Sequence, residues 1–287
     1  MPDPLRIRLM TVKDVEFGLA LCVLAGWNQT ERDWLNLWIC ARDGCFVAEW
    51  EGKPVGTVTT TRYGTDLAWI GMMLVHPAQR RKGIGRALMN HALMHLRSRA
   101  VRCIKLDATP EGKPLYALLG FDEEWTLTRW THALLGGLKS PPNCKVRERR
   151  AEDWGALQNL DSRAFGADRL PLIRQMQGVN RLSCVGISPK GRINSFGFMR
   201  TGRLAVYIGP IIGESLPAAA PAIKVLLASV RGRPVFWDIP DAQTGAIELA
   251  KRLGFEPARQ LTRMFLGENH CPGDPRMIFG LAAPEVG

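Results

Sequence analysis

Two early segments, residues 11–27 and 30–41, carry apolar side chains at the spacing of a helix that is buried on one side. Thr11 and Thr30 stand just before these segments and are candidate N-caps. The predicted buried faces consist of Val15, Leu19, Cys22 and Val23 in the first helix and of Trp34, Leu35, Trp38 and Ile39 in the second. The chain therefore opens with two amphipathic helices.

From residue 45 the pattern changes to alternation, which is typical of strands with one buried face. Residues 45–64 predict a hairpin around the turn "EGKP", and residues 67–77 predict a longer apolar strand. A glycine turn then leads into an amphipathic helix that carries Ala87, Leu88, Met89, Ala92, Leu93 and Leu96. A strand at 101–108, a short helix at 112–121 closed by Gly120, and a strand at 123–130 follow.

The same order then repeats, which predicts an internal duplication. The second set is a helix at 151–165, a hairpin at 182–200, a strand at 204–212, a helix at 218–230, a strand at 234–240, and a helix with a final strand at 244–266. Both halves close with "LGF" and then a strand that contains an arginine. We expect an α/β fold with two domains, residues 1–138 and 144–287, each a mixed sheet flanked by helices, with a boundary near 137–145.

Composition narrows the class of protein. The 287 residues include 46% hydrophobic and 23% charged residues, and the net charge is +11. The start lacks a secretory layout, no apolar run would span a membrane, and seven scattered cysteines show no metal-ligand spacing, so we expect a cytoplasmic protein without a metal. A nucleic-acid partner would explain the positive net charge. However, the basic residues are dispersed along the chain and no nucleic-acid recognition motif is present, so we expect no such partner.

The densest basic group with a functional appearance surrounds the glycine turn in "VHPAQRRKGIGRALM". Another basic run, "CKVRERR" at residues 144–150, lies at the predicted domain junction, where we expect a solvated linker. A strand that feeds a helix through such a turn leaves the first N–H groups of the helix free to bind an anion. Gly83 and Gly85 permit close approach of a pyrophosphate, and the surrounding cations are Arg80, Arg81, Lys82 and Arg86. The turn matches neither a Walker loop nor the dinucleotide fingerprint, and a purely structural turn is the alternative.

The spacing Arg80-x-x-Gly83-x-Gly85 after an apolar strand resembles the acetyl-CoA signature of the GNAT N-acetyltransferases, and "LYALLGF" resembles their closing motif. "GWNQTERDW", "YIGPII" and "LTRMFLG" further resemble a bacterial subgroup with a second, divergent GNAT-like domain. The resemblance implies transfer of an acetyl group from acetyl-CoA. The implied cofactor contacts are Met73, Leu74 and Val75 through a strand bulge, Arg80, Arg81, Lys82, Gly83, Ile84, Gly85 and Arg86 at the turn, and Asp107 and Tyr116.

The chemistry needs an acid for the leaving thiolate and a base or a desolvating pocket for the amine. The Tyr116 hydroxyl can return a proton to sulfur, although packing under the sheet is its alternative role. Glu49 is our first candidate for the base, and the other candidates are Asp66, His76 and Asp107.

The acceptor site is predicted at aromatic and acidic residues of both halves. Trp27, Asn28 and Asp238 are the expected acceptor contacts, and Trp34 and Trp237 are further wall candidates, although such aromatics are usually core residues. In the second half the equivalent turn, "GESLPAAAPAIK", carries Glu214 and prolines, so we expect one cofactor per chain. The predicted acceptor is a small-molecule amine, the protein is a monomer or homodimer, and a non-catalytic acetyl-CoA sensor is the alternative function.

Overall fold

A computed structural model describes residues 4–136, 145–176 and 182–287. The first half contains β1 (Leu5–Leu9), α1 (Val15–Leu24), α2 (Glu31–Cys40), β2 (Cys45–Trp50), β3 (Lys53–Tyr63), β4 (Leu67–Val75), α3 (Ile84–Arg97), β5 (Cys103–Ala108), α4 (Lys113–Leu118) and β6 (Asp122–Leu135). The second contains β7 (Val146–Glu148), α5 (Trp154–Phe165), α6 (Leu170–Met176), β8 (Ser183–Ile187), β9 (Ile193–Thr201), β10 (Val206–Gly213), α7 (Leu216–Ser229), β11 (Arg233–Pro240), α8 (Thr244–Arg252), β12 (Glu256–Gly267) and β13 (Ile278–Gly280).

The two halves repeat the same series of elements, which confirms the α/β class and the duplication, and β13 is an addition. Thr30 caps α2, as expected, whereas Thr11 precedes a short 3₁₀ helix ahead of α1. Val23, which was expected on the buried face of α1, is 52% exposed. The short elements β1, β7, α6 and β13 were not predicted, because three to seven residues carry too little periodicity.

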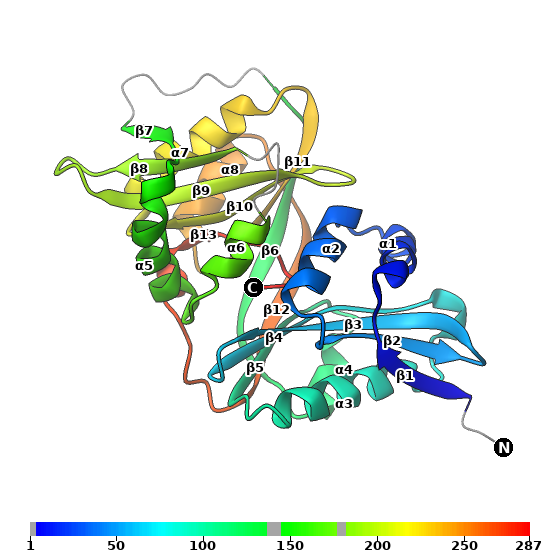
Figure 1. Cartoon of the computed structure of the whole chain (residues 1–287). Coiled ribbons are helices and arrows are strands. Elements are labelled where there is room, and N and C mark those ends of the chain that lie inside the picture. Colours follow the sequence, from blue (N-terminus) through cyan, green and yellow to red (C-terminus); the bar gives the residue numbers. More distant parts are fainter. Residues whose placement is uncertain (1–3, 137–144, 177–181) are drawn as a thin grey trace.

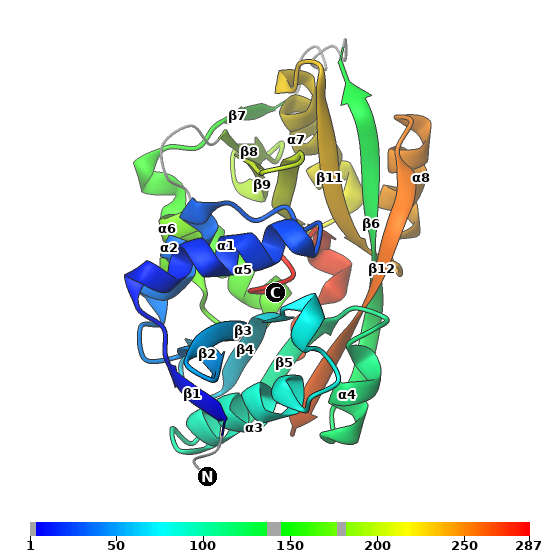
Figure 2. The same cartoon turned by 90° about the vertical axis from the view of Figure 1, so that its right-hand side faces the viewer.

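The thirteen strands of the described residues belong to one continuous sheet, in the order β1-β2-β3-β4-β5-β12-β6-β11-β10-β9-β8-β7, with β13 beside β10. The centre of this order is an exchange of final strands between the halves. β12 of the second half pairs with β5, and β6 of the first half pairs with β11. Figure 2 shows β6, β11 and β12 running together along the right-hand side of the molecule, from the second half above to the first half below. Each half therefore depends on the other for a complete set of strand partners.

Two buried ion pairs join the exchanged strands. Arg129 of β6 donates two hydrogen bonds of 2.7 Å to Asp238 of β11. Arg263 of β12 donates two of 2.9 Å to Asp107 of β5. In each case the arginine and aspartate face one another in the strand register. The arginine near the end of each half thus binds the fifth strand of the opposite half.

The predicted boundary at 137–145 falls almost entirely on residues 137–144, which lie outside the described residues. The division into 1–138 and 144–287 stays a prediction about the sequence repeat. In space the two parts share one sheet, so they are not separated along it.

Helices cover the sheet and leave a junction between the halves. In Figure 1, α3 and α4 lie below the first-half strands, while α1 and α2 lie on the side that faces the second half. The C-terminal segment runs back between the halves, where the Tyr63 hydroxyl donates to the Val286 carbonyl at 2.8 Å and the Trp69 indole donates to the Pro284 carbonyl at 2.9 Å. The first-half core, the second half and the C-terminal segment therefore meet at this junction.

Candidate functional site

Strands β4 and β5 separate at the junction and create an opening in the sheet. Their parallel pairing ends at Trp69 and Lys105. Beyond this point β4 contains a bulge, with a register shift against β3 and a left-handed residue, Met72 (φ 48°). A bulge re-aims the main chain, and the lack of a partner strand on the β5 side leaves polar main-chain groups of β4 accessible there.

A groove of about 870 Å³ runs from this opening to the N-terminus of α3. α3 begins at Ile84, directly after Gly83, whose φ of 77° is a left-handed conformation. A Cβ at Gly83 would meet nothing within 4 Å, so the backbone there is open to a ligand. The exposed Arg80 and Arg81 also line the groove. Free N–H groups, the helix dipole and two arginines are together suited to an anion, so we call this end of the groove the candidate anion site.

The predicted cofactor contacts fall into three groups. The groove is lined by Met73, Leu74, Val75, Arg80, Arg81, Gly83, Ile84, Gly85 and Tyr116. Lys82 and Arg86 are exposed but outside the lining, and the Lys82 amine donates to the Gln79 side chain at 2.8 Å. Asp107 lines an inner cavity instead.

That inner cavity, of about 70 Å³, continues from the groove into the junction of the halves. Five residues line both spaces, namely Trp27, Met73, Thr109, Tyr116 and Arg259. The remaining lining residues of the cavity are Gln29, Ile70, Gly71, Met72, Leu106, Asp107, Leu261, Pro284 and Glu285. Groove and cavity thus meet at Tyr116, with the anion site at the far end of the groove.

Tyr116 lies on α4 and is 9% exposed. Burial raises the pKa of its hydroxyl to about 12, so the hydroxyl keeps its proton at neutral pH. Its ring packs tilted against Phe121, with centroids 6.1 Å apart. The side chain is therefore a fixed, protonated hydrogen-bond donor at the meeting point of two cavities.

Two buried carboxyl groups line the inner cavity. Burial raises the pKa of Asp107, although Arg263 opposes this shift through the ion pair described above. Burial also raises the pKa of Glu285, opposed by Arg200, whose Nη2 lies 3.6 Å from a Glu285 oxygen. The Gln29 amide donates to the other Glu285 oxygen at 2.8 Å. Asp107 is committed to a close bidentate pair, whereas Glu285 has the looser ionic contact.

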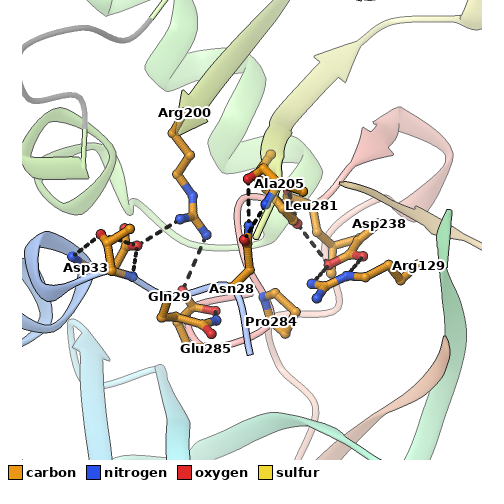
Figure 3. Close-up of polar contacts among 12 residues, drawn as sticks. Asn28, Gln29, Asp33, Arg129, Arg200, Ala205, Asp238, Leu281, Pro284 and Glu285 are labelled. Carbon is orange, nitrogen blue, oxygen red and sulfur yellow. Dashed lines mark hydrogen bonds and ion pairs between the residues drawn. The ribbon is translucent and has the colours of Figure 1, made fainter. Parts of the chain in front are cut away.

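Two predicted acceptor contacts, Asn28 and Asp238, lie away from the cavity lining and join parts of the fold (Figure 3). The Asn28 side chain accepts from the Leu204 and Ala205 amides at 2.8 and 3.0 Å and donates to the Ala205 carbonyl at 3.1 Å. Asp238 is fully buried in its pair with Arg129. Both therefore have structural partners. Asn28 binds the connection between β9 and β10, and Asp238 binds the exchanged strand β6.

The aromatic candidates divide in the same way. Trp27 lines both the groove and the cavity. Trp34 and Trp237 are completely buried core residues, and the Trp237 indole donates to the Phe279 carbonyl at 2.7 Å. Only Trp27 of the three therefore has access to a ligand in the described cavities.

Three candidate bases lie away from the cavity. Glu49 accepts from the Arg8 guanidinium at 2.7 Å on β2. Asp66 pairs with Arg102 on the surface, and His76 caps a 3₁₀ turn by accepting from the Ala78 amide. None of the three lines the groove or the inner cavity.

The second half has an equivalent opening, but the chain itself fills it. β10 and β11 pair only from Val206 to Ile208, and β10 then has a register shift against β9. β13 enters the space beyond, pairing with β10, while the Leu281 amide donates to the Asp238 carbonyl of β11 at 3.0 Å. The following helix, α7, begins with a proline in its first turn, which removes an N–H donor. The described residues of this half therefore form no anion site comparable to the one at α3.

Sequence reasoning missed Gln29, Arg259 and Glu285. Gln29 directly follows the predicted contacts Trp27 and Asn28 in the sequence, and this proximity is the one sequence signal that points to it. Arg259 lies on the exchanged strand β12, and Glu285 lies in the C-terminal segment after β13, so both reach the cavity from the other half of the chain. No local motif marks them.

The described residues also limit other chemistry. They contain no group of three or more histidine, cysteine or acidic side chains that could hold a metal. The six described cysteines are free thiols. No described helix has both the length and the apolarity needed to traverse a bilayer.

Comparisons with known proteins agree with this arrangement. Residues 19–121 match the profile of the "Acetyltransferase (GNAT) family" and residues 157–280 match that of an "Acetyltransferase (GNAT) domain". YitH of Bacillus subtilis, described as an uncharacterized N-acetyltransferase, is 26% identical, with 83% of each chain covered. A holothin acyltransferase from a Pseudoalteromonas species is 27% identical over 91% of this chain and 86% of its own.

Solved structures share the fold over almost the whole chain. An acetyltransferase structure from Pyrococcus horikoshii has a TM-score of 0.85 at 24% identity and covers 100% of this chain and 97% of its own. A tandem protein from the clavulanic acid biosynthesis pathway has a TM-score of 0.66 at 19% identity, covering 91% and 98%.

Proposed function

Since this chain belongs to the GNAT acetyltransferases, with one such domain matched in each half, we propose that it transfers the acetyl group of acetyl-CoA to a primary amine of a small molecule within a ternary complex. The observation that carries this proposal is the continuous path from the α3 anion site, past Tyr116, into the enclosed cavity. A cofactor bound along the groove and an acceptor in the cavity would meet at Tyr116.

The groove residues fit a diphosphate at the α3 end. Arg80 and Arg81 supply charge, and the open backbone at Gly83 lets an anion approach the first N–H groups of the helix. The bulged part of β4 can direct main-chain donors at an acyl oxygen. Acetyl-CoA supplies an acetyl group already activated as a thioester.

Side chains of the cavity can accept and donate the protons that move during the transfer. The amine nitrogen forms the new bond to the acetyl carbon as the carbon–sulfur bond breaks, giving an amide and a free thiol. We assign proton acceptance from the amine to Glu285 in place of Glu49, because Glu285 lines the cavity with a raised pKa. The Tyr116 hydroxyl donates its proton to the leaving sulfur. The Tyr116 phenolate then regains a proton from solvent as Glu285 releases the proton it took from the amine, so both side chains return to their starting states.

We propose one cofactor per chain. In the second half, β13 occupies the opening between β10 and β11, and Glu214 beside α7 pairs with Arg192. A second diphosphate would find a like charge and a proline at the helix start. The second half instead contributes Arg259, Leu261 and Glu285 to the first-half cavity.

A screen of amines tests the proposed reaction. The purified chain is incubated with acetyl-CoA and a panel of amino acids, polyamines, aminoglycosides and aryl amines, and free thiol is measured. We expect thiol release that depends on one class of amine, with the matching N-acetyl product seen by mass spectrometry. Tight acetyl-CoA binding without turnover of any amine would support the non-catalytic sensor instead.

The anion site predicts which cations hold the cofactor. In calorimetric titration we expect the native chain to bind one equivalent of acetyl-CoA, and Arg80→Ala with Arg81→Ala to weaken binding by roughly ten- to a hundredfold, since charge-assisted bonds contribute about 1.5–3 kcal/mol. The loss should shrink at high salt. Arg97→Ala with Arg231→Ala removes the same charge at exposed positions outside the groove and serves as the control. Equal affinities for the two double variants would place the diphosphate elsewhere.

A further inference from the structure

Arg259 is a half-buried cation that lines both the groove and the inner cavity. Among the described residues its Nε is buried without a hydrogen-bond partner. Burial and the neighbouring charge of Arg129 lower its pKa to about 10, and the carboxylates of Asp238 and Glu285 only partly oppose this shift. Leaving a cation in such surroundings is unfavourable unless an anion joins it.

The other arginines of the junction already have carboxylates. Arg129 binds Asp238, Arg263 binds Asp107, and Arg200 lies 3.0 Å from Asp33. Their charge is thus compensated within the fold. Figure 3 shows two of these pairs, Arg129 with Asp238 and Arg200 with Asp33, along with the contact between Arg200 and Glu285.

Arg259 differs from these arginines in two ways. It lines both the groove and the inner cavity. No side chain in the described part of the chain forms an ion pair with it. It lies at the Tyr116 end of the groove, whereas Arg80 and Arg81 line only the groove. An anion held by Arg259 would therefore belong to the acceptor and not to the cofactor diphosphate.

We propose that Arg259 binds a carboxylate of the acceptor, which makes the acceptor an amino-acid-like molecule with an amine and a carboxylate. The inference rests on the proposed function. A planar guanidinium matches a carboxylate in two parallel hydrogen bonds. One negative charge suits Arg259, which forms no ion pair with a side chain in the described part of the chain, whereas a phosphate dianion would add repulsion beside Glu285 and Asp107 in the same cavity. The amine end then faces Glu285.

Product-like probes test this assignment without requiring turnover. The chain saturated with coenzyme A is titrated calorimetrically with N-acetylglycine, N-acetylalanine, N-acetylleucine and N-acetylphenylalanine, and with the primary amide of each. We expect at least one acid to bind about tenfold or more tightly than its amide. In Arg259→Gln this preference should fall to less than about twofold, while Arg259→Lys, which keeps the charge, should retain part of it.

The results separate this inference from the reaction itself. Equal binding of acids and amides, no binding of any acid, or a preference that survives Arg259→Gln would each overturn the carboxylate anchor. Turnover of carboxylate-free amines with those results would leave acetyl transfer standing. A carboxylate preference lost in Arg259→Gln, but with no turnover of any amine, would support the anchor and reject the transfer. Melting curves of both variants check that the fold persists.

Discussion

Replacing Tyr116 by phenylalanine is expected to lower kcat for acetyl transfer about a hundredfold, the lower part of the range for loss of a general acid. The hydroxyl lies where groove and cavity meet, and burial keeps it protonated. Without it, the leaving sulfur must take its proton from water. Since phenylalanine preserves the ring packing, the KM for acetyl-CoA should change by less than about threefold. Steady-state release of free thiol measures both constants.

The chain offers a matched control at Tyr63. This tyrosine is buried and its hydroxyl donates to the Val286 carbonyl, away from both cavities. Tyr63→Phe should therefore reduce the free energy of unfolding by about 1 kcal/mol and leave kcat nearly unchanged. If Tyr116→Phe retains a kcat within about threefold of the native value, Tyr116 is a packing residue and the proposed acid is lost.

The sequence predicted the repeat and the anion site because both are local. Strand and helix periodicity is set by neighbours in the chain. The glycine turn with Arg80 and Arg81 likewise forms within one continuous segment, so its structure does not depend on how the two halves are arranged. The glycine turn thus pointed to the start of α3, and a second local motif, "LYALLGF", pointed to Tyr116. The exchange of β6 and β12 was not predictable, because pairing within a half and pairing between halves bury the same apolar faces.

The exchange also explains why similar residues have different roles. Asp107 and Asp238 end equivalent strands, and both receive an arginine from the opposite half. Asp107 still lines the inner cavity, whereas β13 closes the space beside Asp238 through the Leu281 amide. No pattern within either half distinguishes the two aspartates. The residues that we propose for the acceptor site were missed for a related reason, since Glu285 and Arg259 lie more than 140 positions from Tyr116 in the chain but line the same cavity.

The buried pair of Arg129 and Asp238 predicts the largest effect on stability. Asp238→Ala should reduce the free energy of unfolding by about 3–5 kcal/mol, because it leaves Arg129 as a buried charge without its carboxylate. Replacing both residues, Arg129→Met with Asp238→Leu, should recover most of the loss, since no uncompensated charge remains. Urea unfolding of the three chains measures this. A loss below about 1 kcal/mol in Asp238→Ala would mean that water or another group compensates Arg129.

The same pair makes the free energy of unfolding depend on pH, and the direction of this dependence follows from the pKa of Asp238. Burial raises this pKa, but Arg129 outweighs burial and holds it below its ordinary range. The contribution of the carboxylate to stability is therefore complete above the unfolded pKa of about 4 and is lost as the pH falls through the lower folded value. The native chain should lose stability relative to the double variant as the pH falls below about 4. A difference in unfolding free energy that stays constant from pH 6 to pH 2.5 would show that Asp238 does not carry the charge in the folded chain.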